Sequence, residues 1–288
     1  MALWFAAFAV TVVLAVFQRM TGPSYPLGGT IALANGESIH YKLPRSDEGR
    51  GTLTVAIPAP AAASQAILEW RRFPTEEPFR REVMTANAGG QLEARIPRQP
   101  AAGKVEYRIL IGTAGMIQSI PATETVVARY RGEVPACVLI PHIAAMFLSM
   151  LVSSRALFEV LRPGGPQARG LVLVSMALLV VGGLILGPIV QRFAFGAFWT
   201  GWPFGHDLTD NKTLVAFLAW LPATVLAWRR APTRLAVTLG WVVMMSVFLI
   251  PHSAHGSQLE WSDVGGGLED AGYQIPNARR GQKIAAAQ

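Results

Sequence analysis

The strongest constraint on the fold of this chain is a series of apolar stretches that are long enough to cross a membrane. Residues 2–17 form the first, and almost no charge interrupts the centres of four more, at 137–161, 170–190, 213–228 and 235–251. A helix needs about 20 apolar residues to span a bilayer. With 51% hydrophobic residues, 15% charged residues and a mean hydropathy of +0.35, the composition agrees. We therefore predict about five transmembrane helices.

Basic residues between these stretches predict the orientation. Both short connections carry arginines, which are Arg162 and Arg169 in one and Arg229, Arg230 and Arg234 in the other. Connections rich in Lys and Arg stay on the cytoplasmic side. The N-terminus is then cytoplasmic, while residues 22–133, the loop 191–212 and the tail 252–288 are periplasmic. Residues 1–21 lack a basic leading segment and an A-x-A cleavage site, so we expect a retained anchor.

Residues 22–133 change to short alternating segments separated by turn residues, which is typical of an all-β domain. Asn35-Gly36 predicts a hairpin with a type I′ turn between 30–34 and 37–42. Along 104–112 the apolar Val105, Tyr107, Ile109 and Ile111 should face inward and the alternate residues mostly outward. Further strands are expected at 52–57, 67–73, 79–84, 91–96 and 125–130. This number of short strands favours an immunoglobulin or fibronectin type sandwich.

The predicted fold class is thus a membrane α-helical protein with an inserted all-β sandwich. The domains are an N-terminal transmembrane anchor at 1–21, a periplasmic β-sandwich at 22–133, a four-helix transmembrane domain at 134–251 and an extended periplasmic tail at 252–288. The tail alone has too few apolar residues to fold. It is either disordered or an extended segment that lies along a partner, and we expect the second.

Within the helical part, three smaller features carry expectations. Arg155 and Glu159 stand four residues apart near the end of a span, where they can pair or extend toward lipid headgroups. Gly183 and Gly187 form a small-xxx-small pair that lets another helix approach closely. Cys137, the single cysteine, should be a quiet buried thiol, because one chain cannot build a disulfide or a thiolate cluster from it.

Phe195–Thr213, FGAFWTGWPFGHDLTDNKT, is the most unusual stretch of the sequence. It combines aromatic rings with polar and charged groups, and we take these as candidate site residues together with His252: Phe198, Trp199, Trp202, Phe204, His206, Asp207, Asp210, Asn211 and Lys212. Asp207 and Asp210 suit the N-terminal end of a helix, whose free N–H groups and dipole attract carboxylates. Aromatic rings suit the membrane interface. Exposed aromatics with a few fixed charges are also typical of the centre of a protein interface.

The alternative is a membrane redox protein or enzyme with a metal or haem site on its periplasmic side. In the predicted topology His142, His206, His252 and His255 all lie near the outer membrane boundary, together with the two aspartates. Imidazole and carboxylate groups are common metal ligands. No H-E-x-x-H or C-x-x-C-H string supports this hypothesis.

Other classes of function fit less well. The basic residues are scattered rather than clustered, which argues against nucleic-acid binding. A transporter would call for internal repeats or ionisable groups in the middle of the spans. No nucleophile-base set or phosphate loop indicates an enzyme. We infer no intrinsic cofactor, although the helix surfaces would accommodate pigments or lipids.

Three strings carry a resemblance: PAAGKVEYRI at 100–109, GAFWTGWPFGHDLTDNKTL at 196–214 and IPHSAHGS at 250–257. With them the chain resembles a group of bacterial inner-membrane proteins that have an N-terminal anchor, an immunoglobulin-like periplasmic domain, four further spans and an FWTGxPFGxDLTDNKT loop. The Ala, Arg and Gly content and the architecture also look like an accessory subunit of a Gemmatimonas-type photosynthetic reaction-centre and antenna complex. The resemblance implies a non-enzymatic subunit whose partners are other integral membrane subunits and the bilayer.

Overall fold

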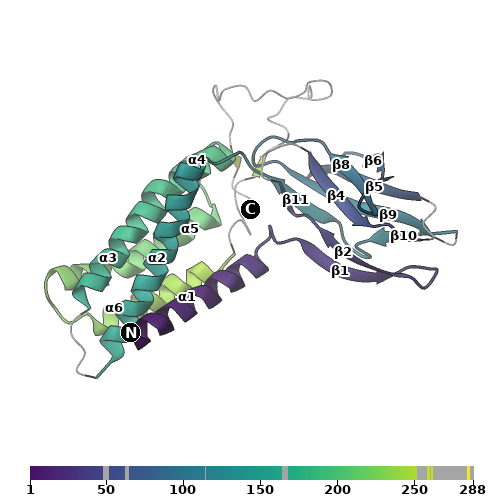
Figure 1. Ribbon diagram of the computed structural model, residues 1–288. Coiled ribbons are helices and arrows are strands. Elements are labelled where there is room, and N and C mark those ends of the chain that lie inside the picture. Colours follow the sequence, from purple (N-terminus) through teal and green to yellow (C-terminus); the bar gives the residue numbers. More distant parts are fainter. Residues whose placement is uncertain are drawn as a thin grey trace. The chain divides into compact units, whose positions relative to one another are not determined.

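The computed structural model describes residues 1–47, 52–61, 65–113, 115–163, 168–251, 258–259, 261 and 284–285. The chain forms two compact units (Figure 1). The helical unit consists mainly of Met1–Gly22 and Val134–Ser257, and the β unit mainly of Pro23–Glu133 and Gln258–Ala285. The chain therefore passes from the first unit to the second and back again.

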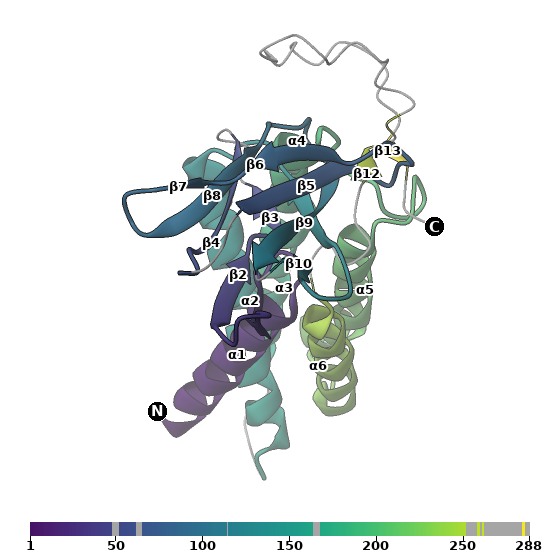
Figure 2. The same ribbon diagram turned by 90° about the vertical axis from the view of Figure 1, so that its right-hand side faces the viewer.

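The helical unit packs its helices side by side around one apolar core (Figures 1 and 2). The elements in chain order are α1 (Ala2–Thr21), α2 (Ala136–Leu161), α3 (Arg169–Leu179), the π-helix η1 (Val180–Leu186), α4 (Gly187–Phe195), α5 (Leu208–Trp228) and α6 (Arg234–Leu249). Because α3, η1 and α4 follow one another without a break, they form one long helix, Arg169–Phe195.

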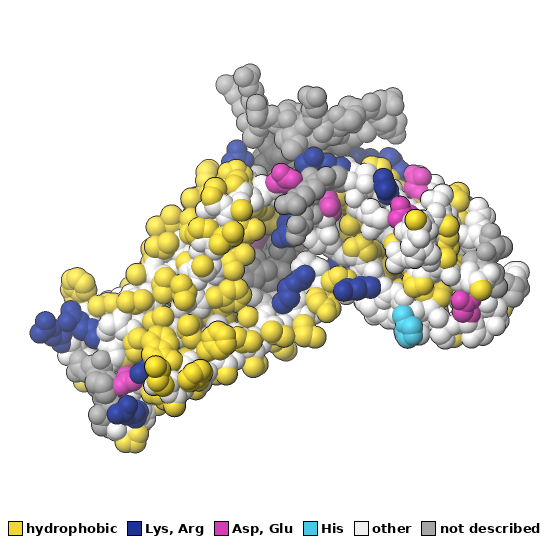
Figure 3. All heavy atoms as spheres, in the orientation of Figure 1, with side chains coloured by type: hydrophobic (Ala, Val, Ile, Leu, Met, Phe, Trp, Pro, Cys, Tyr) yellow, Lys and Arg dark blue, Asp and Glu magenta, His cyan; other side chains and the backbone are white. Residues whose placement is uncertain are grey.

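Three of these helices are long and apolar enough to cross a membrane: α1, α2 and the continuous helix Arg169–Phe195. Helix α6 is apolar but shorter, with 16 residues. Hydrophobic side chains cover the visible face of the helical unit (Figure 3). Many large ones are exposed, among them Phe5, Phe8, Val13, Ile140, Leu148, Val174, Ile185, Leu218 and Leu239. Contiguous apolar surface of this kind marks contact with lipid or protein rather than water, so the helical unit is membrane-associated.

Hydrogen bonds between the helices use small or aromatic polar side chains. The hydroxyls of Ser149 and Ser175 donate to each other's backbone carbonyls across α2 and α3, at 3.1 and 3.3 Å. Trp220 Nε1 donates to Val172 O at 3.2 Å, which joins α5 to α3. Small buried serines let two backbones approach closely and satisfy their own hydroxyls. These contacts set the register of α2 against α3.

Arg155 and Glu159 form the pair that their spacing predicts. Arg155 Nη2 lies 2.5 Å from Glu159 Oε2, and only 15% and 7% of the two side chains are exposed. The guanidinium also stacks over the ring of Trp4, at 5.6 Å from its centroid. The pair is therefore held inside the protein and does not extend into solvent.

In contrast, the expectation for Cys137 is wrong. Its side chain is exposed on the first turn of α2. An apolar helix in a bundle turns part of its surface outward, and sequence alone does not say which part.

The β unit contains several sheets. Its strands are β1 (Leu27–Ala32), β2 (Ser38–Leu43), β3 (Ser46–Asp47), β4 (Leu53–Pro58), β5 (Gln65–Phe73), β6 (Arg80–Val83), β7 (Thr85–Ala86), β8 (Gln91–Ile96), β9 (Lys104–Thr113), β10 (Met116–Ile120), β11 (Val126–Tyr130), β12 (Gln258–Leu259) and β13 (Ile284–Ala285). The largest sheet has the order β3-β11-β9-β5-β6, with β10 paired to β9. Smaller sheets are β4-β8-β7, β1-β2 and β12-β13.

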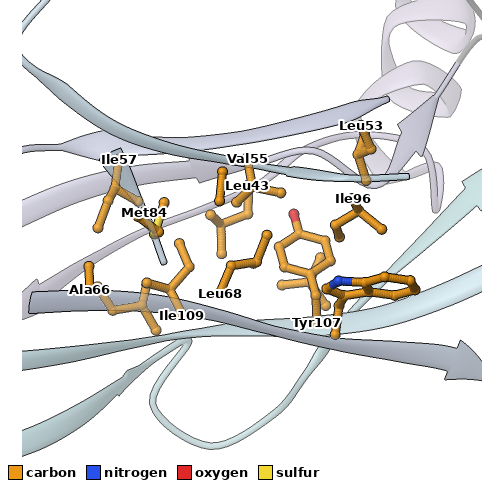
Figure 4. Close-up of a cluster of buried hydrophobic side chains, with 14 of the residues drawn as sticks. Leu43, Leu53, Val55, Ile57, Ala66, Leu68, Met84, Ile96, Tyr107 and Ile109 are labelled. Carbon is orange, nitrogen blue, oxygen red and sulfur yellow. The ribbon is translucent and has the colours of Figure 1, made fainter. Parts of the chain in front are cut away.

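The apolar core of the β unit lies between these sheets. Side chains of β5 and β9, such as Leu68, Tyr107 and Ile109, point toward Val55 and Ile57 of β4 (Figure 4). The inward residues predicted for β9 are all fully buried: Val105, Tyr107, Ile109 and Ile111. This arrangement follows from the period-2 alternation of side chains along a strand.

The opposite face of β9, which we expected to be mostly exposed to solvent, contains a buried charged residue. Glu106 is only 7% exposed. Its carboxylate accepts hydrogen bonds from Arg71 Nε at 2.6 Å and from Thr125 Oγ1 at 2.7 Å. A carboxylate can be buried at this position because it is paired and hydrogen-bonded.

The predicted hairpin forms, since β1 pairs with β2 antiparallel, but the type I′ turn is wrong. Gly36 has a φ of 85°, whereas Asn35 does not have the positive φ that a type I′ turn requires. The loop holds three residues and is closed by Leu33 N–H donating to Glu37 O at 2.7 Å and Gly36 N–H to Leu33 O at 2.9 Å. Such a loop is a type I turn followed by a left-handed glycine.

Candidate functional site

The candidate site is the segment between α4 and α5, residues 196–207, which we name the aromatic loop. Helix α4 ends at Phe195 because Gly196 adopts a left-handed conformation with a φ of 89°. Glycine carries no steric penalty in this conformation, which makes it a common helix terminator. The chain then turns back toward α5.

Asp207 starts helix α5 as its N-cap. Its Oδ1 accepts a hydrogen bond from Thr209 N–H at 2.8 Å. The capping role that the sequence predicts for this residue is therefore confirmed. It also explains why α5 begins at Leu208, before the apolar stretch that starts at Thr213.

Asp210 does not cap the helix in the same way but turns back to hold the loop. Its Oδ2 accepts hydrogen bonds from Thr200 N–H at 2.7 Å and Gly201 N–H at 3.0 Å. Gln191, in the middle of α4, donates from Nε2 to Thr200 Oγ1 at 2.7 Å. A Cβ on Gly201 would lie 2.6 Å from the Cβ of Asp210, so only glycine allows this approach. Asp210 is thus the anchor of the loop backbone.

Asn211 fixes the next peptide of the loop. Its Oδ1 accepts a hydrogen bond from Trp202 N–H at 2.7 Å. The indole Nε1 of Trp199 donates to Trp202 O at 3.1 Å. Consecutive residues of α5 therefore hold the backbone from Thr200 to Trp202, and the loop has a defined shape.

Burial shifts the pKa of two side chains that precede the apolar part of α5, Asp210 and Lys212. Desolvation raises the pKa of Asp210, and the hydrogen bonds from the loop backbone oppose this rise. Desolvation lowers the pKa of Lys212 to about 8, partly offset by the nearby carboxylate of Asp207. Lys212 Nζ donates to Ile250 O at 2.7 Å. The lysine thereby connects the start of α5 to the end of α6.

Large aromatic rings project from the anchored loop. Phe198, Trp202 and Phe204 are 58%, 65% and 82% exposed. Trp199 is only half-buried, and His206 is exposed. Asp210 and Asn211 are thus directed toward the loop backbone, while the rings of Phe198, Trp202 and Phe204 are exposed.

Two of the four histidines predicted as metal ligands, His142 and His206, lie in the described part of the chain. His142 lies in α2, where its Nδ1 donates to Gly182 O at 2.9 Å, and His206 stands on the aromatic loop. His252 and His255 lie outside the described residues. Among the residues that are described, no group of three or more His, Cys, Asp or Glu side chains could hold a metal ion. The metal hypothesis stays a prediction.

Sequence reasoning missed the π-helix η1, which places Gly182 against α2. A Cβ on Gly182 would lie 3.0 Å from both Ala145 Cβ and Met146 Sδ. A Cβ on Gly183 would lie 2.7 Å from Thr213 Cγ2. The close approach predicted for Gly183 is therefore present, whereas Gly187 has no such neighbour nearer than 3.4 Å.

Pro188 supplies the signal that could have indicated the π-helix. It stands directly after η1, at the start of α4. Proline donates no backbone hydrogen bond and its ring clashes with the preceding turn, so a regular helix is interrupted there. Local π-helical turns occur at such interruptions and often lie near functional sites.

A scan against protein-family models gives no match to this chain, and a search of curated proteins gives none either. A crystal structure of a Br derivative of BhCBM56 matches with a TM-score of 0.25 and 16% identity, covering 31% of this chain and 90% of that chain. A laminaripentaose-producing β-1,3-glucanase of family GH64 from Paenibacillus barengoltzii, complexed with laminarihexaose, matches with a TM-score of 0.23 and 14% identity. That match covers 36% of this chain and 20% of the glucanase. Both TM-scores are too low to assign a fold to either unit.

Proposed function

We propose that this protein is a non-enzymatic accessory subunit of a larger bacterial inner-membrane complex, and that the aromatic loop contacts a neighbouring integral membrane subunit. The observation that carries the proposal is the combination of a polar-anchored backbone with the exposed rings of Phe198, Trp202 and Phe204. Large aromatic side chains dominate the binding energy of many protein interfaces.

The fixed shape of the loop supports this role. A loop that must be ordered on binding loses part of its binding energy to conformational entropy. Here Asp210 and Asn211 hold the backbone before any partner arrives. The rings are therefore presented in advance, as an interface requires.

The proposed topology has five spans with the N-terminus in the cytoplasm. Helices α5 and α6 cross the membrane together with the three longer spans, and the two arginine-bearing connections lie inside. The aromatic loop, the β unit and the C-terminal tail are then periplasmic, and we propose an immunoglobulin-like sandwich for the β unit. The helix surfaces are open to lipids or pigments, and neighbouring subunits are clamped from the periplasmic side.

The resemblance to accessory subunits of photosynthetic reaction-centre complexes stays a prediction of the sequence. The proposed interface does not depend on it, because the argument uses only the anchored loop and its exposed rings. A partner with an apolar face at the periplasmic membrane boundary would fit the loop.

The test is assembly in native membranes. We expect the protein from gently solubilised membranes to migrate on a native gel with a mass above that of its monomer. Replacing Trp202 and Phe204 together by alanine should shift it toward the monomer, because the most exposed rings are removed while the anchoring bonds of Asp210 remain.

Trp228 provides a matched control. It is 72% exposed and ends α5, so it lies about 30 Å along the helix from the aromatic loop. Trp228→Ala should leave the assembly unchanged. Migration of the wild type as a monomer, or an equal effect of both variants, would contradict the proposed interface.

A further inference from the structure

The segment that follows the helical unit returns to the β unit and is bound there. Trp261 is the centre of this contact. Its indole Nε1 donates to Phe73 O at 3.0 Å, at the end of β5. The guanidinium of Arg72 stacks over the indole ring, 5.2 Å from its centroid. Trp261 is half-buried, and this site supplies a partner for its N–H group together with a cation–π contact.

Leu259 forms the second contact of the segment. Its N–H donates to Ala102 O at 3.2 Å, and its residue is only 3% exposed. In Figure 2, β12, which contains Leu259, lies beside the end of β5. Leu259 and Trp261 therefore both bind to backbone carbonyls of the β unit, those of Ala102 and Phe73.

The receiving surface is built by the turn at residues 100–103. Gly103 N–H donates to Pro100 O at 3.0 Å, and Ala102 has a positive φ of 67°. A Cβ on Gly103 would lie 3.2 Å from the indole Cη2 of Trp261, which is tighter than ordinary contact. Glycine at this position lets the ring lie directly on the turn. We name this surface, made of Arg72, Phe73, Ala102 and Gly103, the tail socket.

The same turn also holds the strand from which the chain leaves the β unit. Tyr130 N–H donates to Gly103 O at 2.9 Å, and Ala102 N–H donates to Tyr130 O at 3.0 Å. The chain leaves after Tyr130 and returns at Leu259. The same turn of the β unit thus binds both the strand that precedes the helical segment and the residue Leu259 that follows it.

From these contacts we infer that the tail socket is a peptide-recognition site for a Leu-x-Trp segment, and that Leu259 and Trp261 of the same chain occupy it. The backbone carbonyl of Phe73 accepts a hydrogen bond from the indole N–H, and that of Ala102 accepts one from the Leu259 N–H. Arg72 and Gly103 lie against the indole ring. The occupied socket closes the helical segment into a loop whose two ends lie on the β unit. This inference does not rest on the aromatic loop or on its partner.

Arg72 is itself held in place by a neighbouring carboxylate. Its guanidinium forms an ion pair with Glu77, and Nε donates to Glu77 Oε2 at 2.9 Å. A guanidinium that is already paired has a fixed plane on which an aromatic ring can stack. The socket is therefore preformed and does not have to be assembled by the tail.

The first experiment supplies the segment from outside. A fluorescein-labelled peptide with the sequence of residues 256–264, GSQLEWSDV, is titrated into the full chain in detergent and followed by fluorescence anisotropy. The variant that combines Leu259→Ala with Trp261→Ala should bind it, and the wild type should bind it at least about tenfold more weakly, because its own tail competes at millimolar effective concentration. A peptide in which Trp is replaced by Ala should not bind.

Trp228→Ala is the matched control, because it removes a tryptophan that is 72% exposed at the end of α5 and leaves the tail intact. It should behave like the wild type. Equal binding of the peptide to the wild type and the double variant would overturn the inference. So would absence of binding to a double variant that keeps the melting temperature of the wild type.

Hydrogen exchange of the Leu259 amide tests the site without adding a peptide, and it serves also if the double variant does not fold. The amide should be protected in the wild type, because it donates to Ala102 O. Trp261→Phe keeps an aromatic ring but loses the bond to Phe73 O, so exchange at Leu259 should become about fivefold to tenfold faster, as expected for one hydrogen bond. An unprotected Leu259 amide in the wild type would refute occupation of the socket.

Discussion

Asp210 offers the most direct test of how the aromatic loop is held. Its buried carboxylate accepts two backbone hydrogen bonds, from Thr200 N–H at 2.7 Å and from Gly201 N–H at 3.0 Å. Asp210→Ala removes both acceptors and leaves two N–H groups without their partner. The loop backbone should therefore open much more often than in the wild type.

The size of the effect follows from the kind of bond. Hydrogen bonds to charged groups contribute about 1.5 to 3 kcal/mol each, so the two together contribute about 3 to 6 kcal/mol. Part of this is offset by the cost of burying the carboxylate, the same cost that raises the pKa of Asp210. We expect a net loss of about 3 kcal/mol for the closed loop, which is about a hundredfold in the opening equilibrium.

Asn211→Ala is a milder substitution that affects the same loop. It removes one neutral bond, from Trp202 N–H to Oδ1 at 2.7 Å. Such a bond contributes about 1 kcal/mol, which corresponds to about a fivefold change in opening. Asp210→Asn should lie between the two alanine variants, because the amide oxygen still accepts but carries no charge.

The assay is hydrogen exchange resolved at the amides of Thr200, Gly201 and Trp202 in the full chain in detergent. Asp210→Ala should accelerate exchange at the first two amides by about a hundredfold, and Asn211→Ala should act chiefly at the third. If both variants gave the same small acceleration at all three amides, Asp210 would not be the anchor of the loop.

Two further predictions concern the packing around this loop. In the folded protein the pKa of Lys212 is lowered from its ordinary 10.5 to about 8. Between these two pH values the unfolded chain therefore binds more protons than the folded chain, so the stability of the fold should rise with pH from about pH 8 to 10.5. Melting temperatures measured across this range should show the rise in the wild type and not in Lys212→Met, and identical profiles would refute the assignment. Gly183→Ala should destabilise the helical unit by about 1 to 3 kcal/mol, because its Cβ would lie 2.7 Å from Thr213 Cγ2. Gly187→Ala, with no atom nearer than 3.4 Å, should be tolerated, and equal losses of melting temperature in both variants would contradict the contact.

Much of the helical unit could be predicted because lipid-facing and core-facing residues are both apolar. The apolar stretches give α1 and α2 nearly their observed ends, and Arg155 and Glu159 pair at the spacing of one helical turn. The register between helices could not be predicted in this way. It depends on contacts such as Ser149 with Ser175, which are far apart in sequence.

At the start of α5, the sequence predicted the role of Asp207 correctly but not that of Asp210. Asp207 caps α5 because an N-cap needs only local sequence. Asp210 has an equally suitable position for the helix dipole, yet its carboxylate bonds to Thr200 and Gly201. Which N–H groups bind the carboxylate of Asp210 depends on the position of the loop backbone, and local sequence does not specify that position.

The amino-acid sequence by itself determined which parts of this protein are helical, which are β and which stretches are apolar, because periodicity and hydrophobicity act over short distances. Only the tertiary structure decided which polar groups meet. It directed Asp210 and Asn211 inward and the aromatic rings outward, and it brought Trp261 to the turn at Ala102 and Gly103. Such contacts join residues that are far apart in the chain, and their geometry is fixed by packing rather than by pattern.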